Sequence, residues 1–156
     1  MYIIIYDVGT SNVKTGLFDI DSEVRLVAGA SASYGLTILD NGGAAQDPEE
    51  WWASLCSTTR EVFRKTDVSP GDVRGMAFCS QMQSTVLVDE HGTALRPAMN
   101  YLDQRGVKEF RDCMGGGLIR TAGCDALKLV RNLRVNCAAS ASVKDPVWKY
   151  KWVENN

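Results

Sequence analysis

The first residues constrain the fold more than any other part of the chain. Residues 2–6 and 13–20 form two apolar runs rich in β-branched side chains, a pattern typical of buried strands. The segment between these runs is short and contains Gly9, so the chain has to turn back on itself there. The sequence therefore predicts a tight N-terminal hairpin whose turn carries Asp7, Thr10 and Ser11.

The chemistry of this turn suits phosphate. The backbone N–H groups of residues 9–12 and the hydroxyls of Thr10 and Ser11 can donate to one phosphoryl group, and Lys14 adds positive charge. Asp7 ends a strand that we expect to be buried, and a carboxylate there needs a cation or several donors. The alternative is an ordinary hairpin in which Asp7 and Ser11 only satisfy backbone groups of the turn.

The rest of the sequence predicts a mixed α/β layout. Asp47 and Pro48 favour a helix start, with Trp51 and Trp52 on its apolar side and an end near Asp67. His91 lies in a predicted turn and is expected to be solvated. The expected strands are residues 2–7, 13–20, 24–34, 73–79 and 85–89, and the later helices are 107–114, 126–133 and 147–153. This order, β-β-β-α-β-β followed by helices, predicts a mixed sheet with flanking helices.

Composition excludes several classes of function. A chain of 156 residues that is 45% hydrophobic can bury a core. Its net charge of −2 argues against nucleic acid as a partner. Five cysteines without a C-x-x-C spacing argue against a zinc site or a disulfide framework. With no leader-like segment and no apolar run of membrane-spanning length, the expectation is a soluble, cytoplasmic protein without a membrane partner.

Two later segments supply what a phosphate-handling turn lacks. Transfer of a phosphoryl group to an alcohol needs groups around the phosphate, a carboxylate that accepts the hydroxyl proton, and polar groups that hold the acceptor. Asp103 is the candidate for the carboxylate. Residues 81–84, with Tyr101 and Arg105, are candidates for holding a sugar or polyol.

Ordered motifs along most of the chain resemble one family. They are C-S-Q-M-Q-S at 79–84, L-V-D-E-H-G at 87–92, L-R-P-A at 95–98, Y-L-D-Q-R at 101–105 and K-Y-K-W-V-E-N at 149–155. This series resembles the N-terminal domain of the FGGY carbohydrate kinases of the xylulokinase and gluconokinase type. The resemblance implies an actin-like ATPase (ribonuclease H-like) fold and the use of ATP and Mg²⁺.

The resemblance also assigns roles to individual residues. Asp7 is expected to organise Mg²⁺ through water, while Gly9, Thr10 and Ser11 contact the β- and γ-phosphates with support from Lys14. Asp103 corresponds to the base that takes the proton of the sugar hydroxyl, and Arg105 is expected to orient Asp103 or its loop. The residues expected to line the sugar pocket are Gln81, Met82, Gln83 and Tyr101.

Two departures from the family pattern leave the sugar unassigned. This chain has Gln83 where many members have His and Tyr101 where they have Trp; both changes keep hydrogen-bonding or aromatic character but alter the size and reach of the side chain. Ser84 also stands in place of Gly and tightens the same strand end. The resemblance therefore implies a sugar or polyol without naming which one, or which hydroxyl is phosphorylated.

Length is the largest departure. Family members are considerably longer and carry a second, ATP-binding domain. Residues 1–156 are therefore expected to be an incomplete N-terminal fragment of the kinase. Without the C-terminal domain, this fragment is expected to be inactive. An apolar surface uncovered by the missing part would favour a homodimer. The alternatives are a non-sugar ATPase fragment of the actin or heat-shock chaperone type and a non-catalytic binding domain. The kinase interpretation depends on Asp7 and Asp103 facing one crevice.

Overall fold

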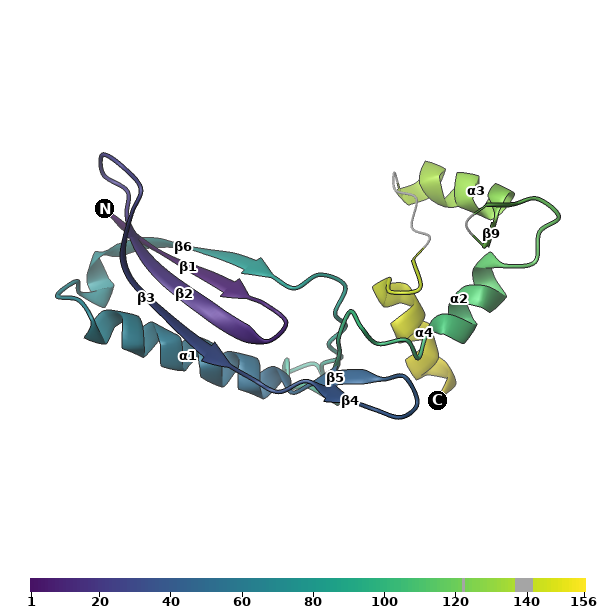
Figure 1. The fold of residues 1–156 in the computed structure, drawn as a ribbon, viewed down its shortest axis with the longest axis horizontal. Coiled ribbons are helices and arrows are strands. Elements are labelled where there is room, and N and C mark those ends of the chain that lie inside the picture. The colour runs from purple at the N-terminus through teal and green to yellow at the C-terminus, as the bar shows by residue number, and fades with distance from the viewer. Residues whose placement is uncertain (122, 137–141) are drawn as a thin grey trace. The chain divides into compact units, whose positions relative to one another are not determined.

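The computed structural model describes residues 1–121, 123–136 and 142–156, arranged in two compact units (Figure 1). Unit 1 contains Met1–Thr37, Gln46–Met82 and Val88–Pro97, and unit 2 contains Ile38–Ala45, Gln83–Leu87 and Ala98–Asn156. Within the described residues, no helix is both long enough and apolar enough to cross a membrane.

A four-stranded mixed sheet forms unit 1. Strands β1 (Tyr2–Val8), β2 (Asn12–Asp19) and β3 (Arg25–Ser33) form an antiparallel meander, as the sequence predicts. Strand β6 (Val73–Ser80) pairs in parallel with β1, which gives the order β3-β2-β1-β6. Figure 1 shows α1 (Pro48–Arg64) running along this sheet. The short 3-10 helix η1 (Pro70–Asp72) precedes β6.

The alternation of side chains along the strands decides which face is buried. Ile4, Tyr6 and Leu17 point to the same face and pack with Val62 of α1 in the core. Residues one position away, such as Asp7, therefore lie on the opposite face. The Asp47 side chain accepts a hydrogen bond from the Glu49 N–H and caps α1, as expected.

Two expectations from the sequence are wrong. Trp52 is 63% exposed rather than part of the core, because it lies about 100° around the helix from the half-buried Trp51. Residues 85–89 do not form a strand, since only isolated bridges join Thr85 to Met99 and Val88 to Ala94. The β-branched run is interrupted because the Asp89 carboxylate accepts hydrogen bonds from the backbone of the following turn, which includes the exposed His91.

Unit 2 is built mainly from helices. Its core joins α2 (Val107–Met114) to α4 (Pro146–Asn155), where the rings of Phe110 and Trp148 meet edge to face at 5.5 Å. Gly106 permits this approach, because a Cβ at that position would lie 2.7 Å from backbone atoms of Trp148. The remaining elements are β8 (Arg120–Thr121), β9 (Cys124–Asp125) and α3 (Ala126–Asn136), and a three-stranded sheet is formed by β4 (Thr37–Ile38), β5 (Ala44–Gln46) and β7 (Ala98–Met99).

Cys56, Cys79, Cys113 and Cys124 are free thiols. Cys137 lies outside the described residues.

Candidate functional site

The turn between β1 and β2 directs its carbonyl groups toward the protein. The Tyr34 hydroxyl donates to the Gly9 carbonyl, and the Tyr34 N–H donates to the Ser11 carbonyl at 3.2 Å. The Thr10 carbonyl accepts from Nε2 of Gln46 at 2.8 Å. Three consecutive carbonyl oxygens are thus held by two donors of Tyr34, the residue that follows β3, and by the side chain of Gln46, the last residue of β5.

The same turn leaves donors unused. The N–H groups and hydroxyls of Thr10 and Ser11 donate to no other residue in the described ranges, whereas the Gly9 N–H donates to the Asn12 carbonyl at 3.0 Å. The expectation that every N–H group of residues 9–12 is available is therefore wrong for Gly9. With carbonyls bound inside and donors left over, the turn has the polarity that an anion requires.

Asp7 is not in the buried position that the sequence suggested. Its side chain is 49% exposed, and its carboxylate lies 3.8 Å from the ammonium of Lys14, its cross-strand partner. Such an exposed pair contributes little to stability, so both groups remain available to a ligand. Both lie on the sheet face opposite α1.

The residues around the turn fit a metal held through water and phosphate. Among the described residues, no group of three His, Cys, Asp or Glu side chains could hold a metal ion directly. A single exposed carboxylate fits Mg²⁺, which keeps several of its waters and binds substrate phosphates. Burial and the nearby charge of Asp7 raise the pKa of Tyr34, which keeps its hydroxyl protonated as the donor to Gly9.

Gln46 connects the turn between β1 and β2 to Gln81, and the sequence analysis missed it. Its side chain is buried, and its Nε2 donates to the Gly35 carbonyl at 3.1 Å as well as to Thr10. Because both N–H bonds are used, its Oε1 has to accept, and it does so from Nε2 of Gln81 at 3.0 Å. Gln81 is also tied to β1 by its N–H, which donates to the Val8 carbonyl, while Met82 is 79% exposed.

Asp103 and Arg105 form a buried ion pair in unit 2. The Asp103 side chain has no exposed surface, and the Arg105 side chain is 6% exposed. Both carboxylate oxygens accept from Arg105, with the shortest contact 2.6 Å to Nη2, and Oδ2 also accepts from the Ala44 N–H at 2.9 Å. The guanidinium lies 4.5 Å from the ring centre of Trp152. Arg105 thus contacts Asp103 as expected, and the carboxylate has no surface open to solvent.

Gln83 is held by two residues at the start of α4. Its amide Nε2 donates to Asp145 at 3.0 Å, and its backbone carbonyl accepts from the ammonium of Lys149. Lys149 is fully buried, and burial lowers the pKa of its ammonium to about 8, although the charges of Asp103 and Asp145 act in the opposite direction. Sequence analysis noticed the K-x-x-W pattern at Lys149 without assigning it a role.

Tyr101, the remaining predicted pocket residue, is half-buried in unit 2. The Lys144 ammonium lies 5.4 Å from the centre of the Tyr101 ring, a cation–π distance.

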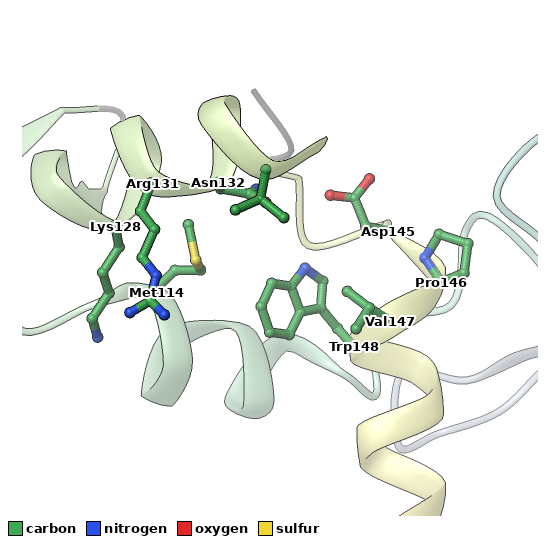
Figure 2. A pocket seen from close by; sticks show the side chains of 9 residues that line it. Met114, Lys128, Arg131, Asn132, Asp145, Pro146, Val147 and Trp148 are labelled. Atoms are coloured by element: carbon green, nitrogen blue, oxygen red, sulfur yellow. The ribbon is translucent and has the colours of Figure 1, made fainter. Parts of the chain in front are cut away.

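A separate hollow of about 760 Å³ lies in unit 2 between α3 and the start of α4 (Figure 2). Figure 2 shows Trp148 facing Met114 and the side chains of Lys128 and Arg131. None of the residues predicted from the sequence lines it. Its lining residues are Met114, Lys128, Arg131, Asn132, Val135, Asp145, Pro146, Val147 and Trp148.

The predicted site residues divide between the two units. Unit 1 holds Asp7, the phosphate turn, Lys14, Gln81 and Met82, and unit 2 holds Gln83, Tyr101, Asp103 and Arg105. The shared crevice for Asp7 and Asp103 stays a prediction.

Comparison with known proteins agrees with these features. Residues 2–122 match the model of the N-terminal domain of the FGGY family of carbohydrate kinases. A glycerol kinase of Alteromonas mediterranea is 29% identical over 112 residues, which are 71% of this chain and 22% of the relative. A xylulose kinase of Staphylococcus epidermidis is 31% identical over 105 residues, or 67% of this chain and 21% of the relative. The chain thus spans about a fifth of these relatives.

A solved structure shows the fold. The ligand-bound xylulose kinase of Lactobacillus acidophilus superposes with a TM-score of 0.75 at 22% identity, covering 99% of this chain and 28% of that one. The predicted actin-like α/β fold is confirmed, and the family match removes the actin and chaperone alternative. The chain belongs to the FGGY family of carbohydrate kinases.

Proposed function

We propose that this chain forms the phosphate turn and part of the acceptor site of an ATP-dependent kinase that phosphorylates a hydroxyl of a sugar or polyol. The observation that carries the proposal is the family match over residues 2–122. The polarity of the turn supports it, because carbonyls held inside and unused N–H groups at Thr10 and Ser11 suit a phosphoryl group.

Phosphoryl transfer depends on positioning and on stabilising charge, and the residues of unit 1 suit these tasks. Thr10 and Ser11 donate to the phosphate, and Lys14 places an ammonium beside it. Asp7 holds Mg²⁺ through a water molecule. The metal, when bound, neutralises negative charge on the phosphates of ATP.

The acceptor is a polyhydroxy compound. Gln81, Met82, Gln83 and Tyr101 offer amide, thioether and phenol groups, which suit hydroxyls on a short carbon chain. The relatives are named xylulose kinase and glycerol kinase, so a sugar or polyol is the substrate class that we assign.

Asp103 remains the proposed base under one condition. A base has to come within about 2.6–3.2 Å of the hydroxyl whose proton it takes. Since the Asp103 carboxylate is covered and bound by Arg105, the loop has to open before it can act. The same burial favours a second candidate function, a non-catalytic domain that binds the acceptor, in which the ion pair is purely structural.

Binding experiments on the purified chain test the proposal. In ¹⁵N-edited NMR spectra, Mg²⁺–ATP should shift the backbone amides of Thr10 and Ser11, and Lys14→Met should weaken this effect. Xylulose or glycerol should shift Gln81 and Gln83. Lys65→Met serves as the control, because its ammonium contacts Glu61 and the Gly29 carbonyl rather than the turn. If neither set of amides responds at millimolar ligand, the proposal fails.

Turnover distinguishes the kinase from the binding domain. Because the chain spans about a fifth of its curated relatives, we propose that contacts needed for transfer lie in the remainder, and that the chain alone releases little ADP. A coupled ADP-release assay with xylulose and glycerol measures this. When the chain is extended to the length of its relatives, the kinase should turn over and the binding domain should not. The predicted homodimer can be measured on the same samples by light scattering.

A further inference from the structure

Gln83 has an unusual backbone conformation. Among the described residues it is the one non-glycine residue with a positive φ, of 60°. Side chains larger than glycine are disfavoured there, and such a conformation persists only when surrounding contacts impose it. Residues held in this way cluster at ligand sites.

Asp145 supplies one of these contacts and does not cap its own helix. It is the N-cap residue of α4, yet its side chain makes no capping hydrogen bond and accepts instead from Nε2 of Gln83 at 3.0 Å. Asp47 occupies the equivalent position of α1 and caps that helix in the usual manner. The Asp145 carboxylate is therefore directed toward Gln83 rather than toward α4.

Lys149 supplies the other contact, one turn into α4. Its side chain is fully buried, and its ammonium donates to the Gln83 carbonyl. Burying a cation is unfavourable unless it is well paired, and the lowered pKa of Lys149 reflects this. Lys149 is therefore poorly explained as a group that merely stabilises the helix.

We propose that Asp145 and Lys149 are positioning residues that fix Gln83 for the acceptor. Lys149 holds the backbone carbonyl and Asp145 holds the amide, so the left-handed conformation and the side-chain orientation are set together. This inference rests on the proposed function, in which Gln83 lines the acceptor site.

The orientation of the Gln83 amide follows from the chemistry of its partner. An ionised carboxylate only accepts hydrogen bonds, so Asp145 selects the NH₂ end of the amide. The Oε1 atom is then left over, and it accepts no hydrogen bond from the described residues. Gln83 thus offers the acceptor an oxygen that receives a hydrogen bond, which suits a hydroxyl group and disfavours a carboxylate.

The experiment reads the Gln83 side chain directly. In ¹⁵N-edited NMR spectra of the full chain, the two Gln83 side-chain N–H protons should be well separated in chemical shift. Asp145→Ala should collapse this separation, and Asp145→Asn should restore part of it, because Asn keeps an accepting oxygen. Lys149→Met should speed amide exchange in residues 83–85 by about tenfold relative to the rest of unit 2. Lys151→Met, on the same helix, is the matched control.

Ligand titration gives the second measurement. Asp145→Ala should weaken binding of xylulose or glycerol by about 5- to 10-fold, the effect of losing one oriented hydrogen bond. If the Gln83 signals are the same in wild type, Asp145→Ala and Lys149→Met, the positioning role is refuted. If Lys149→Met does not fold, Asp145→Ala decides. If the Gln83 signals respond while wild type binds neither compound, positioning stands and the proposed function fails for this chain.

Discussion

Replacing Gln46 with Glu tests whether the hydrogen bonds of its side chain hold the turn between β1 and β2. The substitution is nearly isosteric, but it replaces the donating NH₂ with an oxygen. The carbonyls of Thr10 and Gly35, which Nε2 now binds at 2.8 and 3.1 Å, would face a carboxylate. The Nε2 of Gln81, which donates to Oε1 of Gln46, would still find an accepting oxygen at position 46.

The expected loss of stability is large. A buried polar group left without its partner costs about 1–3 kcal/mol, and two carbonyls lose theirs, so the free energy of unfolding should fall by about 2–6 kcal/mol at pH 8. Burial beside two carbonyl oxygens raises the pKa of the new carboxyl group above that in the unfolded chain. The protonated form can donate to one carbonyl. Stability is therefore higher near pH 5 and is lost as the pH rises through the raised pKa.

Urea denaturation at pH 5 and pH 8 measures both effects. With a slope of about 2 kcal/mol/M, a loss of about 4 kcal/mol lowers the midpoint by about 2 M urea. Gln104→Glu is the matched control, because Gln104 is exposed and no hydrogen bond of its side chain is found in the described residues. A midpoint for Gln46→Glu that equals wild type at pH 8, or that falls equally at both pH values, would refute the reasoning.

Three further outcomes follow from the structure. Tyr34→Phe removes the donor to the Gly9 carbonyl, so the free energy of unfolding, measured by urea denaturation, should fall by about 1 kcal/mol. In NMR spectra, the amides of Thr10 and Ser11 should respond less to Mg²⁺–ATP. The pKa of Lys149 is about 8 in the folded chain, against 10.5 for an ordinary lysine, so the unfolded chain binds more protons between these two pH values. The free energy of unfolding of the wild type should therefore rise with pH in this window, by up to about 3 kcal/mol relative to Lys149→Met. Gly106→Ala should destabilise the α2–α4 packing by about 1–3 kcal/mol, because the added Cβ meets the backbone of α4, and thermal unfolding should show little change for Gly71→Ala.

Local pattern predicted the elements that local forces determine. The β1–β2–β3 meander, the Asp47 cap and α2 follow from alternation, turn residues and helix signals, so they could be placed from the sequence. The helix after Asp47 was given too wide an apolar stripe, and Trp52 was wrongly placed in the core. One step along a helix rotates a side chain by about 100°, so two adjacent tryptophans need not be buried to the same extent.

One physical cause explains why the sequence does not reveal the roles of Gln46 and Lys149. Gln46 lies 36 residues from the Thr10 carbonyl that it binds, and Lys149 lies 66 residues from Gln83. Neither pairing leaves a mark in the nearby sequence, because a buried amide or ammonium is defined by partners that only the tertiary structure supplies. The expectation that Asp7 is buried is wrong for a different reason. It follows from the burial of the strand as a whole, without deciding which face of the sheet Asp7 occupies.

Asp103 shows how burial changes the interpretation of a motif. From sequence, an Asp two residues before an Arg suits a base with an orienting partner. In the structure, the Arg105 guanidinium and the Ala44 N–H both donate hydrogen bonds to the Asp103 carboxylate. Removing one member of such a buried ion pair lowers the free energy of unfolding by about 3–5 kcal/mol. Asp103→Asn should therefore lower stability as well as any activity, and activity alone cannot identify the base. Replacing both members of the ion pair with neutral residues, Asp103→Asn with Arg105→Gln, separates a structural role of Asp103 from a catalytic one. If the role of Asp103 is structural, stability and acceptor binding should recover together in the double variant. A catalytic Asp103 predicts that folding recovers while phosphoryl transfer in the extended enzyme stays lost.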